Sequence, residues 1–200
     1  MTAFVLNLDS VIKLNSEQFY QLCEANRDLK LERNSQGELI IMPPTGGETG
    51  KSNSSVNAQI WFWNEESQLG EVFDSSTGFT LPSGANRSQD VSWVEKSRWN
   101  ALSQEEKERF IPLCPDFVIE IMSPSDNLKK LQDKMQEYME NGCRLGWLIN
   151  RKTKEVEIYR LGQEVEVLVE VLVEVLKLPQ TLSGEDVLPG FVLSMEKIWG

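Results

Sequence analysis

Two acidic residues in strand-like segments are the first candidates for chemistry. Asp90 opens the run 90–94, DVSWV, and Glu120 lies in the middle of the aliphatic run 117–122, FVIEIM. A buried-face carboxylate destabilises a strand unless it is paired, hydrogen-bonded or metal-bound. Two such acids on adjacent strands suit Mg²⁺, which binds one or two carboxylates and several waters and activates water against a phosphodiester. An edge-of-sheet carboxylate paired with lysine or arginine explains the same spacing.

Composition removes several other kinds of site. The chain of 200 residues has no histidine, and its three cysteines, Cys23, Cys114 and Cys143, are widely separated and form no CxxC motif. These facts exclude Ser–His and Cys–His catalytic arrangements and argue against a zinc centre. Any acid–base chemistry therefore falls to carboxylates, lysines or tyrosines.

Charge is unevenly distributed along the chain. The net charge of −11 opposes bulk attraction to nucleic acid. Residues 127–154, however, carry seven basic side chains against three acidic ones, and Lys130 and Arg144 in this segment are candidates for nucleic-acid contact. A solvated mixed-charge helix followed by a turn explains the same residues.

The elements that position these residues alternate between helical and strand patterns. We predict a short helix after Asn15, a β-hairpin over 29–42, helices over 48–67, 97–110 and 126–141, and strands over 71–74, 78–81, 90–94, 117–122, 145–150 and 155–159. This order favours an α/β fold with a mixed sheet flanked by helices.

We interpret residues 1–200 as one domain: an N-terminal helix and hairpin over 1–45, a core over 46–160, and a β-arm and tail over 161–200. Residues 165–176 are three copies of Val-Glu-Val-Leu, which we predict to form a peripheral hairpin arm whose glutamates blunt an exposed edge. No run reaches the roughly 18 apolar residues of a membrane span. The first ten residues lack a signal-peptide pattern, so the cytoplasm is the expected compartment.

Several motifs together resemble a known family. They are Asp90-Val-Ser-Trp-Val, Pro115-Asp116-Phe-Val-Ile-Glu120-Ile, Ser123-Pro124-Ser125-Asp126, Lys134 with Tyr138, Leu145-Gly146-Trp147-Leu148-Ile149, Met42–Gly47 and Leu188–Phe191. This set, which spans nearly the whole chain, is similar to the Uma-type family of restriction-endonuclease-like proteins in the PD-(D/E)XK nuclease superfamily. The resemblance implies a nuclease-like fold, Mg²⁺ dependence with Mn²⁺ as a substitute, and hydrolysis of DNA. A homodimer is expected as the general default.

The resemblance assigns Asp90 as the first acid and Glu120 as the second. The lysine expected two residues after Glu120 is replaced by Met122, which has neither charge nor donor. We predict that Lys134 takes its place, because it lies about 90° from the centre of the apolar stripe of its helix and its stem can follow the core back to the sheet. Pairing of Lys134 with Asp133, Glu137 or solvent is the alternative.

Glu48, near the start of the long helix, matches an additional acid of the superfamily. We predict it as a further metal ligand, although complementing the helix N-terminus explains it equally well.

The resulting hypothesis is a Mg²⁺-dependent endonuclease. A catalytically inactive protein that keeps the fold and binds nucleic acid or a protein partner is the first alternative, favoured by Met122 and the net charge of −11. A two-carboxylate glycosidase is the second. Dependence on Mg²⁺ separates the three.

Overall fold

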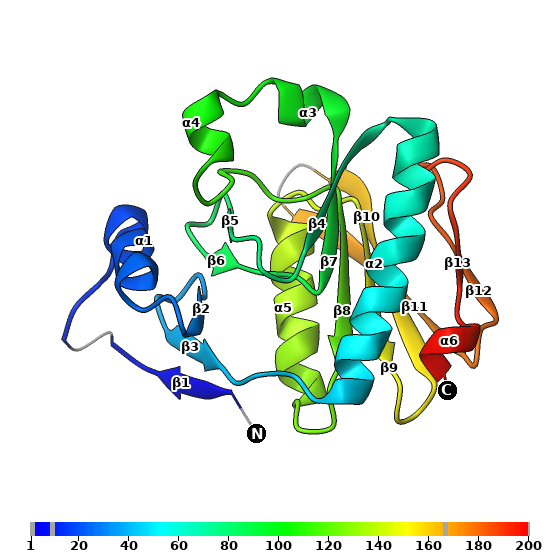
Figure 1. Cartoon of the computed structure of the whole chain (residues 1–200), viewed down its shortest axis with the longest axis horizontal. Helices are drawn as coiled ribbons and strands as arrows, with labels where there is room; N and C mark the ends of the chain where they lie inside the picture. The colour runs from blue at the N-terminus through cyan, green and yellow to red at the C-terminus, as the bar shows by residue number, and fades with distance from the viewer. Residues whose placement is uncertain (1–2, 9–10, 166–167, 200) are drawn as a thin grey trace.

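The computed structural model describes residues 3–8, 11–165 and 168–199 and shows a mixed α/β architecture (Figure 1). The main sheet has the strand order β11-β10-β9-β8-β7-β4. Its strands are β11 (Leu168–Lys177), β10 (Glu155–Val165), β9 (Leu145–Asn150), β8 (Phe117–Met122), β7 (Val91–Glu95) and β4 (Gly70–Asp74). Strands β8 and β9 are parallel and the other neighbours are antiparallel.

The parallel pair requires a crossover, which helix α5 (Leu128–Glu140) provides. Asn127 caps this helix by accepting a hydrogen bond from the Lys130 amide, and the chain leaves it through Gly142, whose φ is +93°. A residue with a Cβ rarely adopts that backbone conformation, so the stop that the sequence predicts at 141–142 is confirmed.

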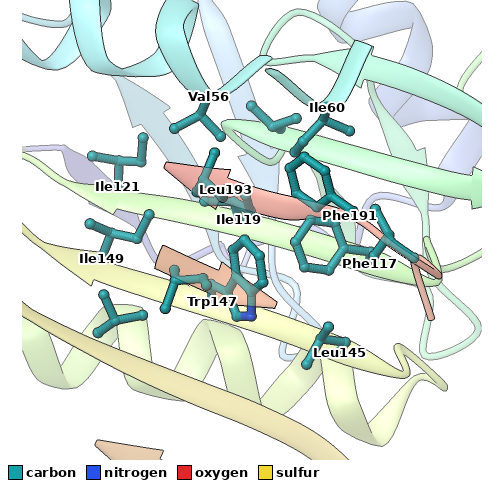
Figure 2. Close-up of a cluster of buried hydrophobic side chains, with 14 of the residues drawn as sticks. Val56, Ile60, Phe117, Ile119, Ile121, Leu145, Trp147, Ile149, Phe191 and Leu193 are labelled. Carbon is teal, nitrogen blue, oxygen red and sulfur yellow. The ribbon is translucent and has the colours of Figure 1, made fainter. Parts of the chain in front are cut away.

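Helices cover both faces of the main sheet, with α2 (Gly47–Ser67) on one face and α5 on the other (Figure 1). Alternate residues of β8 and β9 point toward α2, as Figure 2 shows for Phe117, Ile119, Trp147 and Ile149. Val118 and Leu148 belong to the second core, with Met135 and Tyr138 of α5. Glu120 shares this parity, so its side chain belongs to the α5 face.

A second sheet forms the N-terminal part of the molecule, with the strand order β1-β3-β2-β6-β5. Its strands are β1 (Phe4–Leu6), β3 (Leu39–Met42), β2 (Lys30–Arg33), β6 (Asn86–Arg87) and β5 (Phe79–Thr80). Helix α1 (Ser16–Ala25) packs beside it and begins with a capping box between Asn15 and Gln18. The remaining elements are the paired strands β12 (Thr181–Ser183) and β13 (Val192–Ser194) and helix α6 (Glu196–Trp199).

The predicted strands and the hairpin over 29–42 are confirmed within a few residues, but the single helix predicted over 97–110 is wrong. The chain forms two short helices there, α3 (Lys96–Asn100) and α4 (Gln104–Lys107). Ser103 accepts from the Glu106 amide, and the Glu106 carboxylate accepts from the Ser103 amide. This capping box starts a new helix and interrupts the old one.

The Val-Glu-Val-Leu repeat lies at the periphery, as predicted, because β11 is an edge strand of the main sheet. Residues 166 and 167 of the repeat lie outside the described part of the chain. Glu174 forms an ion pair with Arg160 of β10 at 2.8 Å. Within the described residues, no helix combines the length and the apolar character that crossing a bilayer requires.

Candidate active site in an acidic cleft

A cleft of about 1360 Å³ lies between the β2–β3 hairpin, the first half of α2 and helix α5. Its floor contains Asp90, which immediately precedes β7, and Glu120, in β8. Ten carboxylates line the cleft against four cationic side chains, Lys30, Arg87, Lys130 and Lys134. The cleft therefore has a strongly negative lining that favours cations.

Asp90 and Glu120 are brought together by the pairing of β7 with β8. The register joins Val91 to Ile119, and one further step places Asp90 opposite Glu120. Directly opposed residues on antiparallel strands have Cβ atoms about 4.5–5.5 Å apart on the same face of the sheet. The strands that carry the two acids are neighbours, as the sequence predicts.

Two hydrogen bonds fix the Asp90 carboxylate just before β7. Its Oδ2 accepts from the Ile121 amide at 2.7 Å, and its Oδ1 accepts from the Asn53 side-chain amide at 2.7 Å. Asn53 comes from α2, so three elements converge on this one side chain. The sequence gives no sign that Asn53 belongs to the site.

Lys134 lies beside Glu120. Its Nζ is 2.7 Å from Glu120 Oε1 and donates to Glu32 Oε1 at 3.0 Å and to the Ser88 carbonyl at 3.2 Å. The side chain is buried and its charged end lies over the sheet, which is the orientation predicted from the helical spacing. The alternative in which Lys134 pairs with Asp133, Glu137 or solvent is not what the structure shows.

Glu32 is a second site residue that sequence reasoning missed. It is 2% exposed on β2, accepts from Arg87 Nη1 at 3.0 Å and from the Ser88 amide at 3.2 Å, and pairs with Lys134. Arg87 Nε in turn donates to Glu137 at 2.6 Å. In the sequence Glu32 stands between Leu31 and Arg33, without the aliphatic neighbours on both sides that single out Glu120.

Burial and neighbouring charges separate the proton affinities of these acids. Burial raises the pKa of Glu120 to about 7, the Lys134 ammonium opposes the rise, and the Asp90 and Glu32 carboxylates add to it. Burial also raises the pKa of Asp90, against the Ile121 amide that lowers it. For Glu32 burial is outweighed by Lys134 and Arg87, which lower its pKa to about 2.

Lys134 is held as a cation at neutral pH. Although burial lowers its pKa, the Glu120 and Glu32 carboxylates outweigh that effect and raise the pKa above its ordinary value. Tyr138, which donates to Glu120 Oε1 at 2.9 Å, also has a raised pKa because it is buried and next to that carboxylate. Both groups act here as donors and not as bases.

The side chains present fit a hard divalent cation with two protein carboxylates. Glu120 Oε1 accepts a hydrogen bond from the Tyr138 hydroxyl and forms the ion pair with Lys134, whereas Oε2 takes part in neither contact. Among the described residues no group of three or more acidic or cysteine side chains is placed to hold a metal. Mg²⁺ matches this donor set, because it retains several waters and takes one or two carboxylates.

The other predicted site residues lie in different places. Glu48 is exposed, forms an ion pair with Arg151 at 3.3 Å and does not line the cleft, so the geometry gives no support to a third ligand there. Lys130 lines the cleft. Arg144 is outside it and pairs with Glu95 at 3.2 Å, near the Phe117 end of β8, so its predicted nucleic-acid contact at this site finds no support.

Comparisons with known proteins agree with this architecture. A family model described as "Uma2: Putative restriction endonuclease" matches residues 16–196. The chain is also similar to the crystal structure of a putative nuclease belonging to DUF820 from Anabaena variabilis ATCC 29413, with a TM-score of 0.68 and 21% identity over 84% of this chain and 89% of that chain. At that identity the likeness shows the fold, which confirms the predicted nuclease-like α/β class. Among curated proteins, none matches the sequence.

Proposed function

We propose that this chain, which belongs to the Uma2 family of putative restriction endonucleases, is a metal-dependent endonuclease that hydrolyses DNA phosphodiester bonds. In this proposal Asp90 and Glu120 hold Mg²⁺, with Mn²⁺ as a substitute, and Lys134 completes the catalytic set. The family and the fold support a nuclease in general. The metal, the substrate and the residue roles are the proposal.

The position of Lys134 is the observation that carries it. Met122 leaves the usual lysine position without a charge. The Lys134 ammonium reaches from the facing helix and lies 2.7 Å from Glu120. In this proposal it takes the role of the missing lysine. A structural ion pair would need one acid for this lysine, whereas the cleft holds Asp90, Glu120 and Glu32 around it.

Each side chain then has a distinct task. A bound Mg²⁺ would supply activation of water and neutralisation of charge on the phosphate. Asn53 and the Ile121 amide hold the Asp90 carboxylate in one orientation, and Tyr138 does the same for Glu120. Because the raised pKa of Lys134 keeps it protonated, its task is to stabilise negative charge and not to remove a proton.

A second candidate is a catalytically inactive DNA-binding or protein-binding member of the family. One observation favours it: Glu120 and Glu32 already neutralise the Lys134 charge. In that case the cluster is a buried structural network and holds no metal. The acidic lining of the cleft disfavours DNA binding without a divalent cation, so the two candidates differ in their response to Mg²⁺.

The test is cleavage of supercoiled plasmid and single-stranded DNA across a range of Mg²⁺ and Mn²⁺ concentrations. We expect cleavage only with the ion and none after chelation. Lys134→Met, which keeps the stem and removes the charge, should abolish cleavage. Lys130→Met, which removes a neighbouring cation lining the cleft, should have little effect.

Thermal melts of both variants establish that they fold. DNA retention without cleavage at every metal concentration would favour the inactive binder. Full activity of Lys134→Met would refute its catalytic assignment, and cleavage that ignores chelation would exclude the metal.

A further inference from the structure

Helix α2 has an exposed face, with two aromatic side chains on it, that no other described element covers. Its buried residues, among them Val56 and Ile60, point into the core. On the opposite side Trp61 is 48% and Phe62 is 65% exposed. Their rings contact each other edge to face, with centroids 5.2 Å apart. Two adjacent exposed aromatic rings are typical of an interaction surface.

The residues along the exposed face are complementary to the same residues read in the opposite direction. At 100° per residue, Lys51, Ser54, Ser55, Ala58, Trp61, Phe62 and Glu65 all lie within about 60° of the direction opposite the buried face. The first half of this face is basic and small, and the second half is aromatic and acidic. Ala58 stands between the halves.

We propose that two copies of this chain pair through α2, antiparallel, about a two-fold axis at Ala58. Residues at nearly equal distances from Ala58 and on the same side of the face then meet. Ser55 lies opposite Phe62 and Ser54 opposite Trp61, so small side chains make room for rings. The two-fold axis generates each contact twice.

The charges at the two ends of the face are also complementary. Lys51 lies seven residues before Ala58 and Glu65 seven residues after it, which is about two turns in each direction. Lys51 of one copy therefore faces Glu65 of the other, and its own ion pair with Glu48 is long, at 3.9 Å, and exposed. This self-complementarity selects a second copy as the occupant, because an unrelated partner has no need for it.

The pairing also places two clefts near each other. Ser54 belongs both to the exposed face of α2 and to the lining of the cleft. It is four residues, or about 6 Å along the helix, from the two-fold axis at Ala58. Dimerisation itself is independent of the nuclease proposal and is tested without any activity measurement.

Molar mass in solution is the first test. By sedimentation equilibrium we expect twice 22.8 kDa for the wild type and 22.8 kDa for Phe62→Glu. Phe4→Glu is the matched control, because Phe4 is 68% exposed on β1 and should leave the dimer intact. A monomeric wild type, or a Phe62→Glu variant that remains dimeric, as expected if the exposed edge strand β11 were the interface, would overturn the proposal.

A charge swap tests the antiparallel register. Lys51→Glu should raise the dimer dissociation constant about tenfold, because both symmetric pairs become repulsive. Adding Glu65→Lys should restore wild-type affinity, whereas Glu66→Lys, which lies about 80° from the centre of the face, should not. Circular dichroism checks the fold of each variant. Failure of the double variant to regain affinity would contradict the pairing of Lys51 with Glu65.

Discussion

Glu120 has an unusual environment for a carboxyl group, since it is fully buried with two other acids nearby. Its proton affinity is raised because burial and the Asp90 and Glu32 charges outweigh the Lys134 ammonium. In the unfolded chain the same group has its ordinary pKa of 4.5. The folded protein therefore binds the Glu120 proton more tightly than the unfolded chain does.

This difference predicts a pH-dependent stability in metal-free buffer. As pH rises from about 4.5 to about 7, the unfolded chain releases the Glu120 proton first, so the contribution of this group to stability is lost. The loss is complete above pH 7 and is on the order of 3 kcal/mol. Glu120→Gln lacks this titration, so its melting temperature relative to wild type should be higher at pH 8 than at pH 5.

Calorimetric melts with chelator at the two pH values measure the effect, with Asp133→Asn as an exposed acidic control that should show no such change. If Glu120→Gln were less stable than wild type by the same amount at both pH values, Glu120 would be a structural partner of Lys134.

The position of Lys134 beside Glu120 can be predicted from the sequence, whereas that of Glu32 cannot, for a physical reason. Lys134 is 14 residues from Glu120 in a strand–turn–helix unit, so helical geometry alone brings it back over the sheet. Glu32 meets Lys134 across 102 residues. No local pattern encodes a contact that depends on how the hairpin docks.

At the scale of elements, α2 shows what local pattern can and cannot determine. Periodicity predicts the helix itself. The family resemblance assigns Glu48 to the site, yet Asn53, about 140° further around the helix, is the residue that reaches Asp90. Which face of a helix meets a cleft depends on the packing of the sheet beneath it.

Strands β4 and β7 place α2 against the sheet, and Gly70 is the tightest point of this arrangement. A Cβ at Gly70 would lie 2.3 Å from the Val94 carbonyl oxygen and 2.4 Å from the Trp93 ring. Asn64 of α2 also brackets Gly70, donating to its carbonyl at 2.9 Å and accepting from its amide at 3.2 Å. Neither backbone nor ring can move without disturbing β7.

We expect Gly70→Ala to lower the free energy of unfolding by about 1–3 kcal/mol through overpacking. Gly47→Ala is the control, because nothing lies within 4 Å of a Cβ there and the helix gains stability from alanine. Urea denaturation compares the two. Equal stability of Gly70→Ala and wild type would show that β4 has room to shift.

At the scale of the whole molecule, the chain and the lining of its cleft are both negatively charged. The chain carries −11, and ten carboxylates outnumber four cationic side chains in the lining of the cleft. A polyanion therefore gains little from the protein alone and needs divalent cations in the cleft. The sequence indicated this conflict between an acidic chain and a nucleic-acid substrate. If the acids of the cleft hold a metal ion, that ion supplies the positive charge that a nucleic-acid substrate needs.

The most direct measurement is the rate of plasmid cleavage in Mg²⁺ by wild type, Asp90→Asn and Asp74→Asn. Both aspartates line the cleft. The Asp74 carboxylate accepts hydrogen bonds from the amide and the hydroxyl of Ser76 and takes no part in the proposed site. We predict that Asp90→Asn cleaves about a thousandfold more slowly, since a bound metal contributes several kcal/mol, while Asp74→Asn cleaves at the wild-type rate. Cleavage by Asp90→Asn at the wild-type rate would contradict the account.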